Sequence, residues 1–177
     1  NYFEIAHTIT YVGGMVGDKM NLYSFVDNHD VERIYTKLKD KKHMIPVHIM
    51  LYTLPGIPAI YYGSEFGIEG KKTAGSDDSL RPAVFYEQYI KATKDNAMTK
   101  LIARLGSIRS KTKALSYGDY QELVLTNGQY AFSRNYNGQS VFVTVNNSDN
   151  DFTVSLPIQK KGDYIGGLSG VTVSFKD

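Results

Sequence analysis

The hydrophobic pattern of this 177-residue chain changes near Leu115, and that change restricts the fold more than any other feature. Before it, β-prone runs alternate with stretches whose apolar residues recur every three or four positions, which is typical of parallel α/β structure. After it, Asn-Gly pairs at 127–128 and 137–138 each separate two β-rich runs. Asn-Gly is a strong hairpin signal because both residues tolerate positive φ. We therefore expect an α/β part over residues 1–114 and an all-β part over residues 115–177.

Each part has recognisable elements. In the first we expect strands at 21–26 and 59–63, helices at 40–53 and 95–112, and a polar, glycine-rich loop over 64–79. Pro46 fits the earlier helix only within its first turn, because a proline deeper in a helix removes a backbone hydrogen bond. In the second part Val141, Val143 and Val145 alternate with other residues, and "DFTVSLP" and "VTVSF" predict further strands.

Composition excludes several classes of protein. A net charge of +2 is too small to indicate nucleic-acid binding, and no run of 18 apolar residues predicts a membrane span. The chain has no cysteine, so disulfides and thiolate metal sites are excluded. His43 and His48 do not have zinc-type spacing with His29 and Asp30. We therefore expect no metal, no cofactor, no nucleic acid and no membrane as partners.

The stretch "SFVDNHDVER", residues 24–33, places polar side chains directly after an apolar run. Ligands of parallel α/β proteins bind beyond the carboxyl ends of the strands. His29 and Asp30 follow the first strand, and Ser64 and Glu65 follow the next. If the two strands are neighbours, these residues share one rim. The alternative is an Asx-type turn that caps the following helix and leaves His29 in solvent.

Three linked segments, "FVDNHDVER", "PGIPAIYYGSEFGIEG" and "GSDDSLRP", resemble the C-terminal part of the α-amylase family of glycoside hydrolases. "LIARLGSIRSKTKALSYGDY" then resembles the last barrel helix leading into that family's all-β domain. The resemblance implies the last strand–helix units of a (β/α)8 TIM barrel, followed by a C-terminal antiparallel β-sandwich. "VERI" and "DDSLRP" look nearer to the cyclomaltodextrinase and neopullulanase branch than to long-chain amylases, and transglycosylases and α-glucosidases of the family share the same segments.

The resemblance also implies roles for individual residues. Asp30 matches the third catalytic carboxylate, which stabilises the transition state, and His29 matches the sugar-binding histidine beside it. Hydrogen bonds to ring hydroxyls that tighten in an oxocarbenium-like transition state supply several kcal/mol. Asp77 and Arg81 match a pair that binds an α-glucan oligosaccharide further along its non-reducing side. For that pair, a loop salt bridge is the alternative.

Other polar residues of these segments are given structural roles. Arg33 is interpreted as a structural partner for nearby carboxylates. Glu65 is interpreted as structural, or as a support for the site. Calcium in a longer parent enzyme has no support in these residues.

The catalytic set is incomplete in this chain. Retaining glycosidases need two carboxyl groups about 5–5.5 Å apart, and the family carries them on earlier barrel strands. Glu4 and Asp18 precede Ser24 but do not lie in comparable motifs. We therefore expect the C-terminal portion of a retaining hydrolase of α-1,4-glucosidic bonds in starch-like or maltooligosaccharide substrates. It would lack the nucleophile and the acid/base and be inactive alone. The missing N-terminal part of the barrel, or self-association, would cover its exposed apolar surface.

A second hypothesis is a non-catalytic carbohydrate-binding or structural β-domain. Carbohydrate-binding surfaces use exposed aromatic rings, and the all-β part offers Tyr117, Tyr120, Tyr130 and Tyr136. Sheet packing is the alternative explanation for these tyrosines. Titration with maltooligosaccharides separates the two hypotheses.

Overall fold

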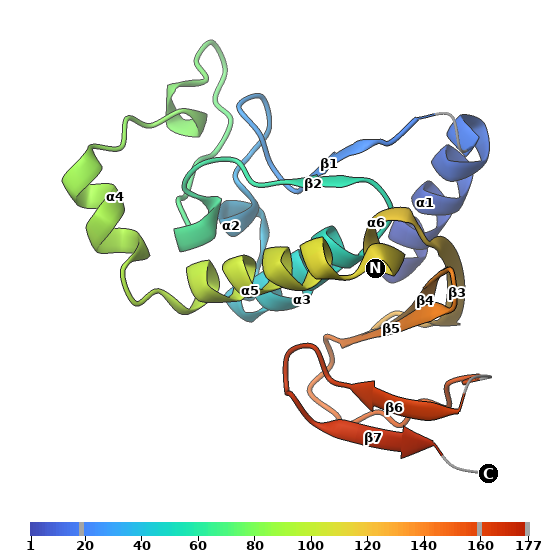
Figure 1. Ribbon diagram of the computed structural model, residues 1–177. Coiled ribbons are helices and arrows are strands. Elements are labelled where there is room, and N and C mark those ends of the chain that lie inside the picture. Colours follow the sequence, from blue (N-terminus) through green and yellow to red (C-terminus); the bar gives the residue numbers. More distant parts are fainter. Residues whose placement is uncertain (18–19, 159–160, 176–177) are drawn as a thin grey trace.

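The computed structural model describes residues 1–17, 20–158 and 161–175, and it has a mixed α/β part followed by an all-β part (Figure 1). The helices are α1 (Tyr2–Val16), α2 (Ile34–Lys37), α3 (Met44–Thr53), α4 (Tyr86–Thr93), α5 (Ala97–Lys111) and α6 (Lys113–Tyr117). Short 3-10 helices are η2 (Lys41–His43), η3 (Ser64–Phe66) and η4 (Asp78–Leu80). The strands are β1 (Tyr23–Phe25), β2 (Ile57–Ala59), β3 (Asp119–Leu125), β4 (Gln129–Tyr136), β5 (Gln139–Asn146), β6 (Gly162–Ile165) and β7 (Thr172–Phe175).

Two short parallel strands organise the first part of the chain. β1 pairs with β2 in parallel, with Tyr23 opposite Ile57 and Phe25 opposite Ala59. α3 lies on the connection between them, beside α5 (Figure 1). The expected strand–helix–strand unit is therefore present. The prediction of the second strand at 59–63 was wrong, because pairing already begins where the Ile57 amide donates to the Leu22 carbonyl at 2.7 Å.

The helices differ from expectation at their boundaries. The helix expected over 40–53 divides into η2 and α3, and Pro46 lies in the first turn of α3, as its missing N–H requires. The sequence patterns did not reveal α1 or α4. The Asn1 side chain caps α1 by accepting from the Glu4 amide at 3.2 Å. α1 then buries Tyr2 and Ala6 against the all-β part.

Antiparallel hairpins build the second part. β3, β4 and β5 form one sheet in sequential order, with the two Asn-Gly pairs at its turns. Asn137 and Gly138 adopt positive φ, as the hairpin prediction requires, whereas Asn127 and Gly128 turn the chain without it. "VTVSF" contains β7, as predicted, but the structure assigns no strand to "DFTVSLP" at 151–157. β7 pairs with β6, a strand that the sequence pattern did not reveal.

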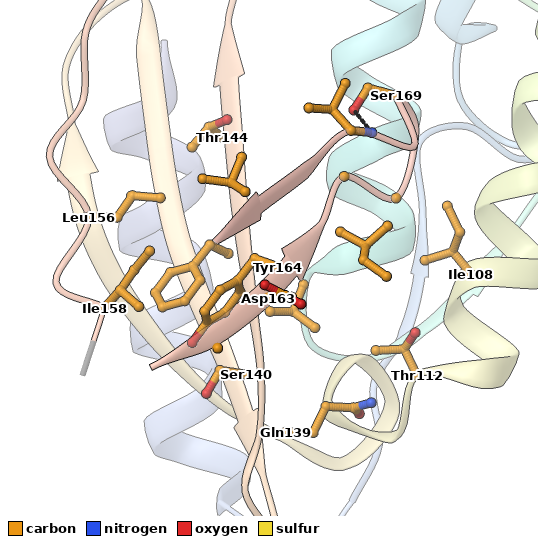
Figure 2. A pocket seen from close by; sticks show the side chains of 18 of the residues that line it. Ile108, Thr112, Gln139, Ser140, Thr144, Leu156, Ile158, Asp163, Tyr164 and Ser169 are labelled. Atoms are coloured by element: carbon orange, nitrogen blue, oxygen red, sulfur yellow. Dashed lines mark hydrogen bonds between the residues drawn. The ribbon is translucent and has the colours of Figure 1, made fainter. Parts of the chain in front are cut away.

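A cavity of about 820 Å³ separates the β6–β7 hairpin from β5 and the end of α5 (Figure 2). Ile108, Leu156, Ile158 and Tyr164 are among the residues that line it. The described residues of the first part form one pair of parallel strands and no closed barrel. In the all-β part they form a sheet and a hairpin around this open space. The barrel and the sandwich therefore stay predictions.

The main core crosses the expected boundary between the two parts. Tyr2, Ala6 and Met50 pack in one buried cluster with Tyr130, Phe132, Val143 and Val145. The rings of Tyr2 and Tyr130 stack with their centroids 5.6 Å apart. The boundary at 114/115 falls within α6, and the division into two domains stays a prediction.

Two buried arginines hold the turn between α3 and β2, and one of them, Arg134, joins the two parts. Arg134 of β4 donates from Nη1 to the Thr53 carbonyl at 2.8 Å, and Arg109 of α5 donates to the Tyr52 carbonyl at 2.7 Å. Burial lowers the pKa of Arg134 to about 10. The all-β part therefore holds the turn that leads directly into β2.

Candidate functional site

The segments that follow β1 and β2 lie on the same side of the molecule, at the top of Figure 1. This arrangement follows from the parallel pairing, because the carboxyl ends of neighbouring parallel strands lie at one edge. Residues 26–33 leave β1 there, and Tyr61 and Tyr62 follow β2. Gly63, at a φ of 86°, turns the chain into η3. The loop over residues 67–82 rises on the same side.

We call this edge, formed by residues 26–33, Tyr61, Tyr62 and the 67–82 loop, the rim. A buried ion pair lies beneath it. Asp27 and Arg33 are almost inaccessible to solvent, and Arg33 Nε lies 3.3 Å from Asp27 Oδ2. Ser64 Oγ donates to Asp27 Oδ1 at 2.7 Å, and the Ile34 amide donates to Asp27 Oδ2 at 2.8 Å. A buried charge is tolerated when it is paired and hydrogen-bonded. Asp27 thus ties the exit of β1 to the exit of β2.

Arg33 extends the support to the 67–82 loop. Its Nη1 donates to the Leu80 carbonyl at 3.1 Å, and its amide donates to the Gly70 carbonyl at 3.0 Å. Its Nη2 donates to the Tyr62 carbonyl, and the guanidinium carbon lies 4.5 Å from the centroid of the Tyr61 ring. These contacts agree with the structural role expected for Arg33.

Above the buried support lies an exposed cluster of His29, Asp30, Asp77 and Arg81. His29 Nε2 lies 3.3 Å from Asp30 Oδ2, and Arg81 Nη2 lies 3.0 Å from Asp30 Oδ1. The same Nη2 lies 3.0 Å from Asp77 Oδ2. Lys72 Nζ donates to the Asp30 carbonyl at 3.0 Å. The structure thus brings all four predicted site residues together, although some 50 residues separate the two pairs in the sequence.

The Asx-turn alternative is present, but not at Asp30. Asn28 Oδ1 accepts from the Asp30 amide at 2.8 Å, which is an Asx turn. The first amide of α2 is satisfied by Asp27, since Ile34 N donates to that carboxylate. The Asp30 carboxylate therefore does not cap the helix. It stays 58% exposed, with one oxygen toward His29 and the other toward Arg81.

Ser64 and Glu65, expected on the rim, are buried instead. Ser64 turns toward Asp27, and the Glu65 carbonyl accepts from Thr99 Oγ1 at 2.9 Å. A hydrogen bond to the Glu65 carboxylate is the main cause that raises the pKa of Tyr89. Both residues therefore support the rim from beneath.

Sequence reasoning missed several contributors to this rim, among them Asp27, Lys72 and Tyr61. The ring of Tyr61 lies beside His29, with centroids 6.4 Å apart. The signal for Asp27 was an acidic residue directly after an apolar run, with Arg33 six positions later. Nothing in the sequence distinguished Lys72 from other loop lysines.

His48 of α3 is fully buried. Its Nδ1 is hydrogen-bonded to the Met44 carbonyl at 2.8 Å, and within the described part of the chain its Nε2 has no partner. Burial lowers the pKa of His48, while the Met44 carbonyl and the nearby Asp27 charge act against that shift. The lowered pKa favours the neutral imidazole, and His48 lies in α3 and not in the exposed cluster.

The exposed cluster can accept hydrogen bonds from a polar ligand. A carboxylate has two acceptor positions on each oxygen. Asp30 Oδ1 accepts from Arg81 Nη2 at 3.0 Å, and Asp30 Oδ2 lies 3.3 Å from His29 Nε2. Both oxygens therefore keep an acceptor position for a pair of neighbouring hydroxyls. Among residues 1–17, 20–158 and 161–175, the structure has no group of three or more His, Cys, Asp or Glu side chains arranged to hold a metal ion. No helix in the same ranges is long and apolar enough to cross a membrane.

Comparison with known proteins adds a family to this geometry. The sequence profile of the α-amylase catalytic domain matches residues 4–114. A cyclomaltodextrin glucanotransferase of Bacillus sp. (strain 38-2) is 28% identical over 158 residues, which cover 85% of this chain and 21% of that protein. A cyclomaltodextrinase of Thermoanaerobacter pseudethanolicus is 28% identical over 146 residues, covering 81% and 24%. The chain thus spans about a fifth to a quarter of the length of these relatives.

Solved structures agree with the fold. A cyclomaltodextrin glucanotransferase with a three-domain arrangement superposes with a TM-score of 0.82 at 26% identity, covering 98% of this chain and 35% of that one. An α-amylase of Geobacillus thermoleovorans, solved with acarbose, gives a TM-score of 0.77 at 23% identity and covers 96% and 38%. At that identity the second likeness concerns the fold alone.

Proposed function

Because the chain belongs to the α-amylase family, we propose that it is the C-terminal portion of a retaining enzyme acting on α-1,4-glucosidic bonds. The proposed substrates are starch-like glucans and maltooligosaccharides. Relatives named cyclomaltodextrin glucanotransferase and cyclomaltodextrinase support this substrate class. Their share of matched length supports a longer parent protein, since the chain spans only about a fifth to a quarter of each.

The exposed Asp30 carboxylate is the single observation that carries this proposal. It lies at the carboxyl edge of a parallel strand pair, with His29 on one oxygen and Arg81 on the other. Two neighbouring sugar hydroxyls fit the remaining acceptor positions on the two oxygens of such a carboxylate. In the proposed reaction these hydrogen bonds strengthen as the ring gains positive charge, so Asp30 lowers the barrier as a transition-state stabiliser.

The other three residues have substrate-binding roles in this proposal. His29 donates to the same sugar from beside Asp30, and the exposed imidazole in contact with Asp30 supports that role. Asp77 and Arg81 contact the next sugars toward the non-reducing side. The loop salt bridge that was the alternative for this pair is present, at 3.0 Å, and a salt bridge does not preclude sugar binding.

The nucleophile and the acid/base are proposed to come from preceding barrel strands outside this chain. Parallel strands are normally covered on both faces. Here Tyr23, Phe25 and Ile57 are exposed on β1 and β2, with Tyr23 69% accessible. This apolar surface supports a partner, which we propose to be the remaining strands of the barrel. Static light scattering of the chain alone, with and without the upstream polypeptide, distinguishes that partner from self-association.

The test of the catalytic role is Asp30→Asn in an enzyme that contains this chain and the upstream strands. The expected result is a kcat that falls far more than KM rises, because the lost interaction is made mainly in the transition state. Asp95→Asn is the matched control, since Asp95 pairs with Lys100 at 3.0 Å on an exposed surface. An unchanged kcat in Asp30→Asn would refute the role.

One observation keeps a second function under consideration. The exposed ring of Tyr117 lies 5.7 Å from that of Tyr136, which leaves an aromatic pair on the surface of the all-β part. Tyr130 is buried in the core, and the hydroxyl of Tyr120 is hydrogen-bonded to that of Tyr130, so these two serve packing. Maltooligosaccharide binding lost in Tyr117→Ala and retained in Asp30→Asn would support a carbohydrate-binding module.

A further inference from the structure

We propose that Arg81 is a positioning residue that fixes the Asp30 carboxylate in its working orientation. The inference deepens the proposed function and rests on the catalytic role of Asp30. It differs from the sugar-binding role of Arg81 because it acts on every substrate, including one too short to reach Arg81. Three hydrogen bonds of one guanidinium carry it.

The donors of Arg81 are directed largely at protein acceptors. Its Nε donates to the His29 carbonyl at 3.0 Å, and its Nη2 donates to Asp30 Oδ1 and to Asp77 Oδ2, each at 3.0 Å. Arg81 therefore contacts the backbone of one site residue and the side chain of the next. Among the described residues, these three hydrogen bonds use Nε and Nη2 and not Nη1. A planar guanidinium can span such a set of acceptors because its donors are fixed in one plane.

The backbone next to Arg81 is anchored by buried contacts, so the Arg81 side chain can position another group. The preceding residue, Leu80, is completely buried, and its carbonyl accepts from the buried Arg33 at 3.1 Å. Arg33 is paired in turn with Asp27. Because its backbone is anchored in this way, Arg81 has less freedom of movement than an ordinary surface arginine.

Asp30 has few other constraints on its orientation. Its carboxylate is 58% exposed, and its second neighbour, His29, lies at 3.3 Å and is itself 57% exposed. Catalysis of this kind depends on placing the carboxylate oxygens correctly against the ring hydroxyls. A misplacement of about 1 Å costs on the order of 100-fold in rate. The hydrogen bond from the anchored Arg81 to Asp30 Oδ1 prevents such a misplacement.

The experiment compares two substrates in the enzyme that contains this chain and the upstream strands. An aryl α-glucoside places a single sugar at the cleavage position, whereas an aryl α-maltotrioside extends toward Asp77 and Arg81. We expect Arg81→Ala to lower kcat on both substrates by about 10- to 100-fold, with little change in KM on the glucoside. Added guanidinium ion should restore part of the kcat. Arg81→Lys should remain low, because a point charge cannot span the carbonyl and the two carboxylates.

Arg104→Ala is the matched control. Arg104 also donates through Nε and Nη2, but to the Gly167 carbonyl at the far end of α5. We expect it to leave both substrates unaffected. An unchanged kcat on the glucoside, with a loss only on the maltotrioside, would overturn the positioning role and leave sugar binding alone. A loss accompanied by lower stability and no guanidinium rescue would also overturn it.

Asp30→Asn distinguishes a failure of the proposed function from a failure of the positioning role alone. If that variant keeps its kcat, the proposed function itself fails. If it loses activity while Arg81→Ala keeps the full kcat on the glucoside, only the positioning role fails.

Discussion

The Asp27→Asn variant tests whether the buried ion pair beneath the rim holds the two strand ends together. The substitution preserves the shape of the side chain and removes its charge. It leaves the Arg33 guanidinium, which is fully buried, without its counter-ion at 3.3 Å. It also weakens the hydrogen bonds that the carboxylate accepts from Ser64 and from the Ile34 amide.

The magnitude follows from the burial of both partners. Breaking a buried pair by removing one charge costs about 3–5 kcal/mol, because the remaining charge is uncompensated. The Leu80 and Tyr62 carbonyls still accept from Arg33 in the variant, so we expect the lower part of that range. For a chain of this size, each kcal/mol corresponds to roughly 2–4 °C in Tm.

The assay is urea unfolding followed by far-UV circular dichroism and by the fluorescence of the 14 tyrosines. The midpoint should fall while the m-value stays constant. Asp95→Asn, in an exposed pair with Lys100, is the matched control and should not measurably change the midpoint. In a double-mutant cycle with Arg33→Met, the double variant should lose less stability than the sum of the single variants. Additive losses, or a loss in Asp27→Asn below about 1 kcal/mol, would refute the reasoning.

Two further perturbations test the surroundings of the site. In Gly70→Ala the added Cβ would collide with the Ser79 carbonyl oxygen and lie 2.8 Å from Arg33 Cγ, so urea unfolding should show a loss of about 1–3 kcal/mol. Gly128→Ala, whose nearest neighbour would be 3.5 Å away, is its control, and equal losses in the two variants would contradict the steric explanation. Burial lowers the pKa of His48, so the folded chain binds fewer protons than the unfolded chain. The free energy of unfolding should therefore be largest above the unfolded pKa of about 6.5 and fall as the pH drops below it, with a smaller fall in His48→Gln. Identical pH profiles for the two proteins would exclude His48 as the cause.

Much of the fold is determined by local sequence. Asn137 and Gly138 both tolerate positive φ, so their hairpin follows from two residues. The apolar stripe of the helix expected over 95–112 predicts α5 closely, because helical periodicity is a property of one continuous segment. α4 has only eight residues and buries none of them, so its periodicity is too short to identify a helix from the sequence. The linked motifs around Asp30 and Arg81 were sufficient to indicate the family.

The sequence by itself therefore determined the succession of an α/β and an all-β part, and which short motifs carry the polar residues. Only the tertiary structure decided that Asp27 is buried while Asp30 is exposed, and that Ser64 turns inward to meet Asp27. An irregular turn has no period that fixes which side chain points inward, so neighbouring carboxylates cannot be distinguished locally. The contact between Arg81 and Asp30 depends on the parallel pairing of β1 with β2 and on a loop anchored by Arg33, and both are interactions between residues distant in sequence.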